Sequence, residues 1–141
     1  MRSWIEGVLA IGIIVGLGAV FFLFSGESLT DGSPTTTAPI TADPAAAERG
    51  ETVANSIGCL ACHTVDGTPG SGPTWKGLAG SSRPLESGDV VIANDEYLTL
   101  SIVDPPAQVV AGFEAIMPNY SDQLTSEDIS DLVEYVKSLA S

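Results

Sequence analysis

The sequence predicts a small all-α domain behind a single N-terminal membrane-spanning helix, with one short β-hairpin among the helices. Three observations support this prediction. Residues 1–24 hold a long uncharged apolar run, residues 25–43 are rich in Thr, Pro, Ser and Gly, and residues 125–139 place apolar side chains at helical spacing. We therefore divide the chain into an anchor at residues 1–24, a flexible linker at 25–43 and one folded domain at 44–141.

The anchor is predicted from the 18 residues between Gly7 and Phe24, none of which is charged. As an α-helix this run would extend about 27 Å, close to the ~30 Å hydrocarbon core of a bilayer. The alternative is a cleaved signal peptide, whose apolar region usually has only ~7–15 residues and is followed by small residues. Because this run is longer and ends in Phe21-Phe22-Leu23-Phe24, we expect a retained single-pass helix.

The positions of the basic residues predict the orientation. Arg2 precedes the apolar run, and the next base is Arg49. The positive-inside rule therefore places the N-terminus in the cytoplasm and the folded domain on the periplasmic side of the cell membrane. Residues 25–43 have almost no side chains to bury, so we expect them to form an extended tether.

The chain is strongly acidic, with a net charge of −13 from 18 acids and 5 bases. Residues 44–141 contribute 14 of the acids and 4 of the bases, which gives the domain a charge of −10. Binding to nucleic acid requires clustered Lys and Arg to neutralise phosphates. This balance argues against a nucleic-acid partner.

Each element of the domain has its own sequence signal. Asp43 is a suitable cap for a first helix that starts at Pro44 and continues to about residue 56. A second helix is expected over residues 94–103, before two consecutive prolines. A hairpin is expected where residues 83–85 face residues 90–92 across Ser87-Gly88.

The last helix has the clearest pattern. Thr125 and Asp128 suit its N-terminal cap. Its apolar residues form one stripe, made of Ile129, Leu132, Val133, Val136 and Leu139.

The segment Cys59-Leu60-Ala61-Cys62-His63 carries the chemistry. Residues at i, i+3 and i+4 share one face of a helical turn, so both thiols can reach the two vinyl groups on one edge of a haem. This spacing is the signature of covalent haem c attachment, with His63 as an axial iron ligand. A thioredoxin-like site would need a βαβ context, and a zinc site would need a fourth ligand, although the chain has no other Cys or His.

Met117 is the candidate for the second axial position. His63 is the only histidine, Met1 lies on the other side of the membrane, and Met117 is the one remaining methionine. Core packing is the alternative role for a lone Met. A His/Met pair raises the reduction potential and leaves the iron no open position for a substrate. We therefore expect an electron-transfer protein and not an enzyme.

On these residues the domain resembles the class I c-type cytochromes, in which N-terminal and C-terminal helices cross over one haem. The resemblance places Gly50 at this crossing, packed against Leu132 and Tyr135. Gly72-Pro73-Thr74-Trp75 resembles the family's Gly-Pro-x-Leu segment. It implies that the Pro73 carbonyl accepts a hydrogen bond from the ligand histidine, and that Trp75, in place of leucine, packs against the haem edge.

Two segments, residues 70–78 and 111–113, further resemble the cytochrome c domain of haem-copper oxidase subunit II and the monohaem subunit of alternative complex III. The dinuclear copper ligands of an oxidase subunit II are absent. The resemblance implies a membrane electron-transfer complex that takes electrons from a quinol-oxidising donor and passes them to an oxidase or reaction centre. The alternatives are a free membrane-tethered shuttle and a ligand-sensing or peroxidase-type haem protein.

Overall fold

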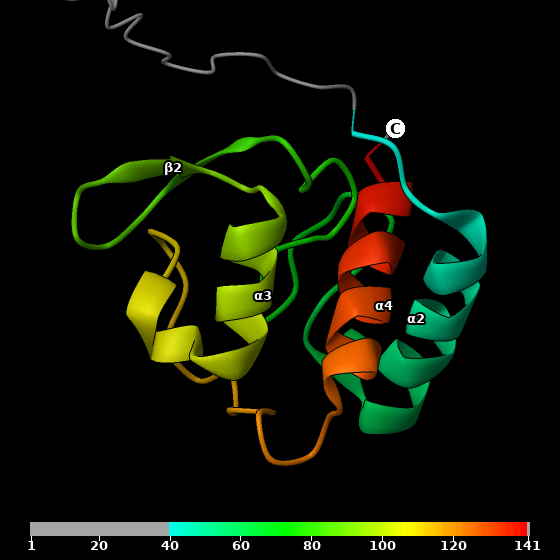
Figure 1. Cartoon of the computed structure of the whole chain (residues 1–141). Helices are drawn as coiled ribbons and strands as arrows, with labels where there is room; N and C mark the ends of the chain where they lie inside the picture. Colours follow the sequence, from blue (N-terminus) through cyan, green and yellow to red (C-terminus); the bar gives the residue numbers. More distant parts are fainter. Residues whose placement is uncertain (1–39, 141) are drawn as a thin grey trace, which may run out of the picture. The chain divides into compact units, whose positions relative to one another are not determined.

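The structure is a computed structural model that describes residues 40–140. The helices in this part of the chain are α2 (Pro44–Ile57), α3 (Asp95–Val103) and α4 (Ser126–Ser138), with short 3-10 turns η1 (Cys59–Ala61) and η2 (Pro105–Gln108) between them (Figure 1). The mostly helical domain agrees with the sequence prediction. Within residues 40–140 no helix has the length and apolar character needed to cross a membrane. The predicted anchor and nearly all of the predicted linker lie outside the described residues.

Helix α2 begins and ends at the residues that the sequence favours. The Asp43 carboxylate accepts hydrogen bonds from the backbone N–H groups of Ala45 and Ala46, both at 2.9 Å. Pro44 occupies the first turn, where a missing N–H leaves no hydrogen bond unmade. The helix stops at Gly58, whose φ of 85° is the left-handed conformation that glycine adopts without strain.

Helix α4 carries the predicted cap and a wider buried face than predicted. Thr125 and Asp128 form a reciprocal capping box, in which each side chain accepts from the backbone N–H of the other residue. Leu132, Val133 and Val136 of the predicted stripe are buried, and so are two residues outside it, Asp131 and Tyr135. Ile129 and Leu139 are only partly buried.

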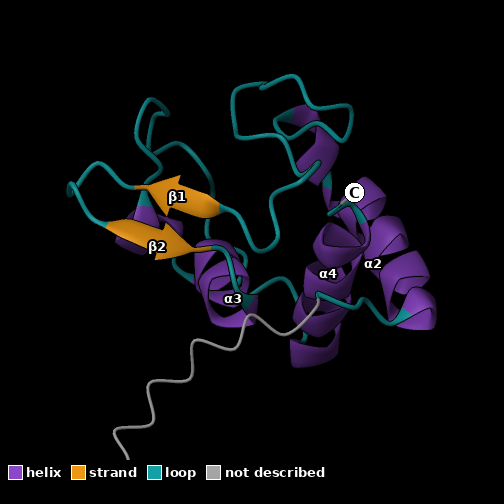
Figure 2. Ribbon diagram, turned by 90° about the horizontal axis from the view of Figure 1, so that it is seen from above, coloured by secondary structure: helices purple, strands orange, loops and turns teal. Residues whose placement is uncertain are grey.

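Helices α2 and α4 pack side by side through Gly50, as both ribbon views show (Figures 1 and 2). A Cβ atom built on Gly50 would overlap the Asp131 carbonyl and lie 2.9 Å from the Cβ of Tyr135. Tyr135 is therefore a crossing partner as expected, and the main chain of Asp131, which the sequence did not indicate, comes closest to Gly50. An Arg49–Asp131 pair with two hydrogen bonds of 2.7 Å spans the same contact.

The first strand of the hairpin lies one residue earlier in the sequence than predicted, and the second strand lies where predicted. Strands β1 (Ser82–Pro84) and β2 (Val90–Ile92) are antiparallel, with Arg83 opposite Val91 (Figure 2). Leu85, the residue after the strand, donates its N–H to the Asp89 carbonyl in the turn and forms an isolated bridge with Val110. The hairpin thereby attaches to the segment that follows η2.

Helix α3 completes the domain. Asn94 caps it by accepting a hydrogen bond from the Tyr97 N–H, and it ends before Pro105 as predicted. Its buried residues, Tyr97 and Leu98, join one core with residues of the other elements: Ala54, Trp75, Leu78, Leu85, Leu124, Leu132, Val133, Tyr135 and Val136.

Candidate haem-binding site

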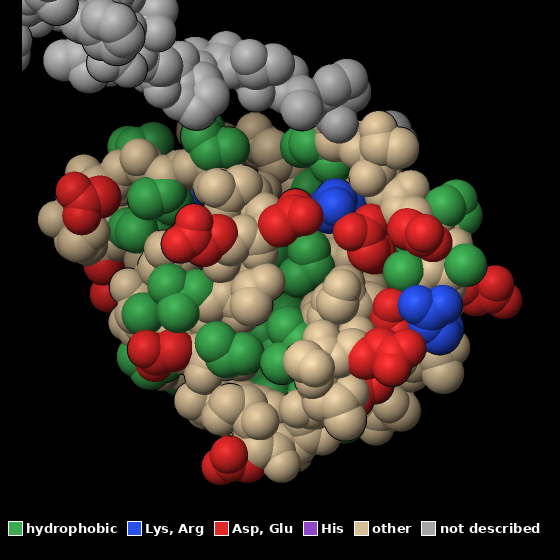
Figure 3. Space-filling model, viewed as in Figure 1, with side chains coloured by type: hydrophobic (Ala, Val, Ile, Leu, Met, Phe, Trp, Pro, Cys, Tyr) green, Lys and Arg blue, Asp and Glu red, His purple; other side chains and the backbone are tan. Residues whose placement is uncertain are grey.

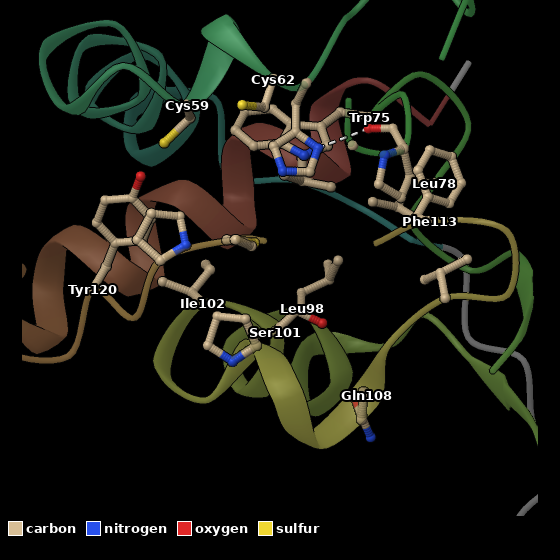
Figure 4. Close-up of a pocket in the computed structure, with 18 of the residues that line it drawn as sticks. Cys59, Cys62, Trp75, Leu78, Leu98, Ser101, Ile102, Gln108, Phe113 and Tyr120 are labelled. Carbon is tan, nitrogen blue, oxygen red and sulfur yellow. Dashed lines mark hydrogen bonds between the residues drawn. The ribbon is translucent and has the colours of Figure 1, made fainter. Parts of the chain in front are cut away.

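An open, mostly apolar pocket lies between α3, α4, η1 and the chain that follows η2 (Figure 4). It holds about 1280 Å³ of empty space, counting the part that is open to solvent. The residues from the predicted site that line it are Cys59, Cys62, His63, Pro73, Trp75 and Met117.

The two cysteines reach the pocket through the turn that follows α2. Gly58 reverses the chain direction, and the N–H groups of Cys62 and His63 both donate to the Cys59 carbonyl, at 3.2 and 3.0 Å. This turn presents both cysteines at one end of the pocket (Figure 4). Cys59 is half-buried and Cys62 is exposed, and both are free thiols. The arrangement suits attachment to two neighbouring groups on one edge of a ligand.

His63 is held in the form that binds a metal. Its Nδ1–H donates to the Pro73 carbonyl at 2.7 Å, the bond that the resemblance implied. With the proton on Nδ1, the Nε2 lone pair remains available to a metal. Burial lowers the pKa of His63, and the bond to Pro73 partly opposes this shift. The neutral imidazole is therefore the main form at neutral pH.

The loop from Gly72 to Trp75 closes tightly around this ring. A Cβ on Gly72 would lie 2.7 Å from Cε1 of His63, so a larger residue would displace the imidazole. Trp75 is buried and stacks on His63, with ring centroids 5.1 Å apart and planes inclined by 25°. Its other side meets Tyr135 edge-on at 5.9 Å. Trp75 therefore lies between His63 and the Tyr135 side chain of α4 and holds the imidazole in place. Its expected contact with the haem edge stays a prediction.

Met117 reaches the same pocket from a distant part of the chain. It is half-buried, in a segment without regular structure. The Tyr120 N–H donates to the Ile102 carbonyl at 3.3 Å, which ties this segment to the end of α3. The structure thus places Met117 and His63 in the lining of one cavity. Ligation by Met117 stays a prediction.

Sequence reasoning missed the pocket residues that α3 and the following chain supply. Leu98 and Ile102 face the pocket one helical turn apart, and Tyr120 directs its hydroxyl group toward Cys59 (Figure 4). The i, i+4 spacing of Leu98 and Ile102 was a usable signal for an apolar face. Nothing in the sequence indicated Gln108, which also lines the pocket.

These residues fit a covalently bound haem. The pocket is wide and largely apolar, two thiols lie at one end, and a neutral imidazole stands beside them. The zinc alternative gains no support, because in residues 40–140 no three Cys, His, Asp or Glu side chains gather as a metal site. When bound, the haem supplies one iron that takes up and releases a single electron.

Comparison with known proteins agrees with this chemistry. The family described as Cytochrome c matches residues 47–140, which is more than half of the chain. Among solved structures, cytochrome cH from Methylobacterium extorquens is 26% identical, with a TM-score of 0.49, and the match covers 65% of this chain and 97% of that one. No curated protein matches the sequence. From the family match and the Cys59-Leu60-Ala61-Cys62-His63 segment in its pocket, we conclude that the chain belongs to the cytochrome c family, whose members carry electrons on covalently bound haem c.

Proposed function

We propose that this cytochrome is a membrane-anchored monohaem carrier of single electrons, in which His63 and Met117 are the two axial iron ligands. One observation carries the proposal: the two residues line the same apolar pocket, although they are far apart in the sequence. With both axial positions filled by the protein, the iron has no place for a substrate or a gaseous ligand. This arrangement favours electron transfer over peroxidase chemistry or ligand sensing.

The anchor and tether belong to the proposal. Residues 1–24 form a single-pass helix with a cytoplasmic N-terminus, and residues 25–43 connect it to the haem domain on the periplasmic side. As a flexible coil, this linker of 19 residues has a root-mean-square span of about 24 Å. Tethering at that range raises the effective concentration of the haem domain at a partner in the same membrane.

The surface charge supports a basic docking partner. Among the bases of residues 40–140, Arg49 is paired with Asp131, and Lys137 is paired with Asp95 and Glu134. Acidic side chains are spread over the face shown in Figure 3, where basic ones are few. Such a field steers a partner with a basic patch toward the domain and weakens as salt rises.

We further propose that the chain serves as a subunit of a quinol-oxidising complex of the alternative complex III type. It would receive electrons from that complex and pass them to an oxidase or a reaction centre. The sequence resemblance of residues 70–78 and 111–113 supports this assignment. A free tethered shuttle is the competing arrangement.

Purification of the full chain from membranes in mild detergent tests the assignment. We expect a fixed ratio of this chain to other membrane subunits through two chromatographic steps. A matched variant with residues 1–24 replaced by a cleavable signal peptide should be released in soluble form. A parent chain that elutes alone from the detergent extract would contradict the subunit role, and a parent chain already soluble without detergent would contradict the anchor.

A further inference from the structure

The outer face of the β-hairpin carries a group of exposed apolar side chains. Exposure alternates along both strands, so Pro84 of β1 and Val90 and Ile92 of β2 lie on one outward face. Val90 and Ile92 are 66% and 53% exposed, and Pro84 lies directly opposite Val90. In the view from above, both strands lie in front of the helices (Figure 2). A single exposed aliphatic residue is ordinary, whereas a group on one face marks a contact surface for an apolar partner.

The described chain begins beside this face. A Cβ built on Gly80 would overlap Cδ1 of Ile40, so the Ile40 side chain lies against Gly80. The Gly80 N–H donates at 2.9 Å to the carbonyl of Ala93, the residue that follows β2. Three residues after Ile40, the Asp43 N–H donates to the Glu134 carboxylate of α4 at 2.7 Å. These contacts fix the point at which the linker joins the domain, next to the end of β2.

We propose that the outward side chains of Pro84, Val90 and Ile92, called the hairpin face below, rest on the lipid surface of the membrane that holds the anchor. Ile40 is 39% exposed and extends this apolar surface to the point where the linker joins. Burial of aliphatic side chains at the boundary of headgroups and acyl chains stabilises such a contact in proportion to the apolar area removed from water. The inference rests on the proposed anchor and adds the orientation of the domain above it.

The length of the linker favours the hairpin face over the opposite side of the domain. A domain of this size has a radius of gyration of about 13 Å, and thus a diameter on the order of 30 Å. The linker of 19 residues spans only about 24 Å as a flexible coil. With the hairpin face on the bilayer, both ends of the linker lie near the membrane and the linker keeps its freedom. The opposite side could reach the bilayer only if the linker extended around the domain, which costs conformational entropy.

Charges near the hairpin face indicate which lipids suit it. Glu86 and Asp89 are exposed in the turn between the strands, and the domain as a whole carries a charge of −10. Anionic lipids would repel these acids, so the matching surface is zwitterionic. The same charge argues against a second copy of this chain as the partner, because two such domains repel each other.

Contact through the hairpin face directs the attachment cysteines away from the bilayer. Helix α2 leads from the linker to Gly58, just before Cys59, and its 14 residues extend about 21 Å. In Figure 1 the hairpin and the start of the described chain lie at the top, and the end of α2 lies at the bottom. The edge of the haem that is bonded to Cys59 and Cys62 therefore faces the aqueous space, where an electron-transfer partner can approach it.

The test uses the full chain with its haem, reconstituted in phosphatidylcholine nanodiscs. An added cysteine carries an NBD fluorophore, either through Ser82→Cys on the outer side of β1 or through Asn55→Cys near the far end of α2; both residues are exposed. In the holoprotein Cys59 and Cys62 are bonded to the haem, so only the added cysteine takes up the label. Brominated phosphatidylcholine quenches a label that touches the lipid, and iodide quenches a label in water.

The hairpin face is then disrupted by the double substitution Val90→Ser with Ile92→Ser. Val65→Ser is the matched control, because Val65 is an aliphatic residue that is 39% exposed outside the hairpin. The haem absorbance of each variant confirms that the domain is folded.

We expect brominated lipid to quench the label at Ser82 and to leave the label at Asn55 bright. The double substitution should lower the ratio of membrane-bound to free domain at least about tenfold, which is ~1.4 kcal/mol, and Val65→Ser should leave the ratio unchanged. In nanodiscs that include anionic phosphatidylglycerol, the quenching should be weaker at low salt than at high salt.

The proposal is wrong if brominated lipid does not quench the label at Ser82, or if the double substitution leaves the quenching unchanged. A label at Ser82 that is shielded from iodide but not quenched by brominated lipid would place a second copy of the chain on the hairpin face, which also overturns the proposal. A chain that nanodiscs do not retain would overturn the anchor itself, and this inference with it.

Discussion

Gly50 offers the sharpest test of how the two terminal helices meet. The helices approach so closely there that a Cβ on Gly50 would overlap the main-chain carbonyl of Asp131 and lie 2.9 Å from the Cβ of Tyr135. A main-chain carbonyl in the middle of α4 cannot rotate out of the way as a flexible side chain can. Any larger residue at Gly50 must therefore push α2 and α4 apart.

The size of the effect follows from two opposing contributions. Replacement of a mid-helix glycine by alanine stabilises an isolated helix by about 1 kcal/mol. Overpacking of a tight contact costs about 1–3 kcal/mol or more. Gly50→Val adds more volume and gains less helix propensity than Gly50→Ala, so we expect a net loss of about 1–3 kcal/mol. In a domain of this size that loss lowers the melting temperature by about 4–24 °C.

Thermal unfolding followed by far-ultraviolet circular dichroism measures the shift. Asn55→Val is the matched control, because Asn55 is an exposed residue five positions along the same helix. A surface substitution of this kind usually changes stability by less than ~0.5 kcal/mol. The haem spectrum of the folded fraction should stay unchanged in both variants. If Gly50→Val melts at the same temperature as Asn55→Val, the helices do not cross at Gly50.

Three further predictions follow from named contacts. Arg49→Leu should lower the unfolding free energy by about 1–3 kcal/mol, measured by urea titration, because it leaves the buried Asp131 carboxylate without its partner; an unchanged midpoint would contradict this. The hydrogen bond from the Thr125 hydroxyl lowers the pKa of the Asp128 carboxyl below 3.8. The stability that this cap contributes is therefore complete above pH 3.8 and is lost as the pH falls through the lowered pKa. The stability difference between the parent and Asp128→Asn should therefore shrink on acidification, and a constant difference would argue against the cap. Deletion of half of residues 25–43 should slow electron delivery to the acceptor more than it slows reduction by the donor. Added salt should slow the encounter with the partner. Stopped-flow rates that respond to neither change would indicate a rigidly docked subunit.

The sequence predicted the helix ends well because local residues determine them. Asp43 and Pro44 start α2, and Thr125 with Asp128 starts α4, through bonds within four residues of the chain. The first strand of the hairpin was misplaced by one residue for the opposite reason. Leu85 forms a bridge with Val110 just after the strand, a contact between residues far apart in the sequence that no local pattern contains.

The candidate site also has a part that the sequence predicted and a part that it did not. Cys59, Cys62 and His63 form a local motif whose spacing alone indicated the cofactor. The stacking of Trp75 between His63 and Tyr135 could not be predicted, since it depends on how the loop packs against α4. The close approach of the Asp131 main chain to Gly50 was missed for a related reason. Helical spacing gives the face that α4 presents, but not which main-chain atom of that face comes closest.

The sixth ligand is the central claim of the proposed function, and replacement of Met117 tests it most directly. The neighbouring residue Ile116 provides the control, because its side chain is 58% exposed and Ile116→Ala changes the same segment without removing the thioether. We predict that oxidised Met117→Ala loses the weak near-infrared sulfur–iron band and that the reduced form binds carbon monoxide, while Ile116→Ala keeps the band and excludes carbon monoxide. If Met117→Ala keeps the band and excludes carbon monoxide, Met117 is a packing residue and the His/Met electron carrier is contradicted.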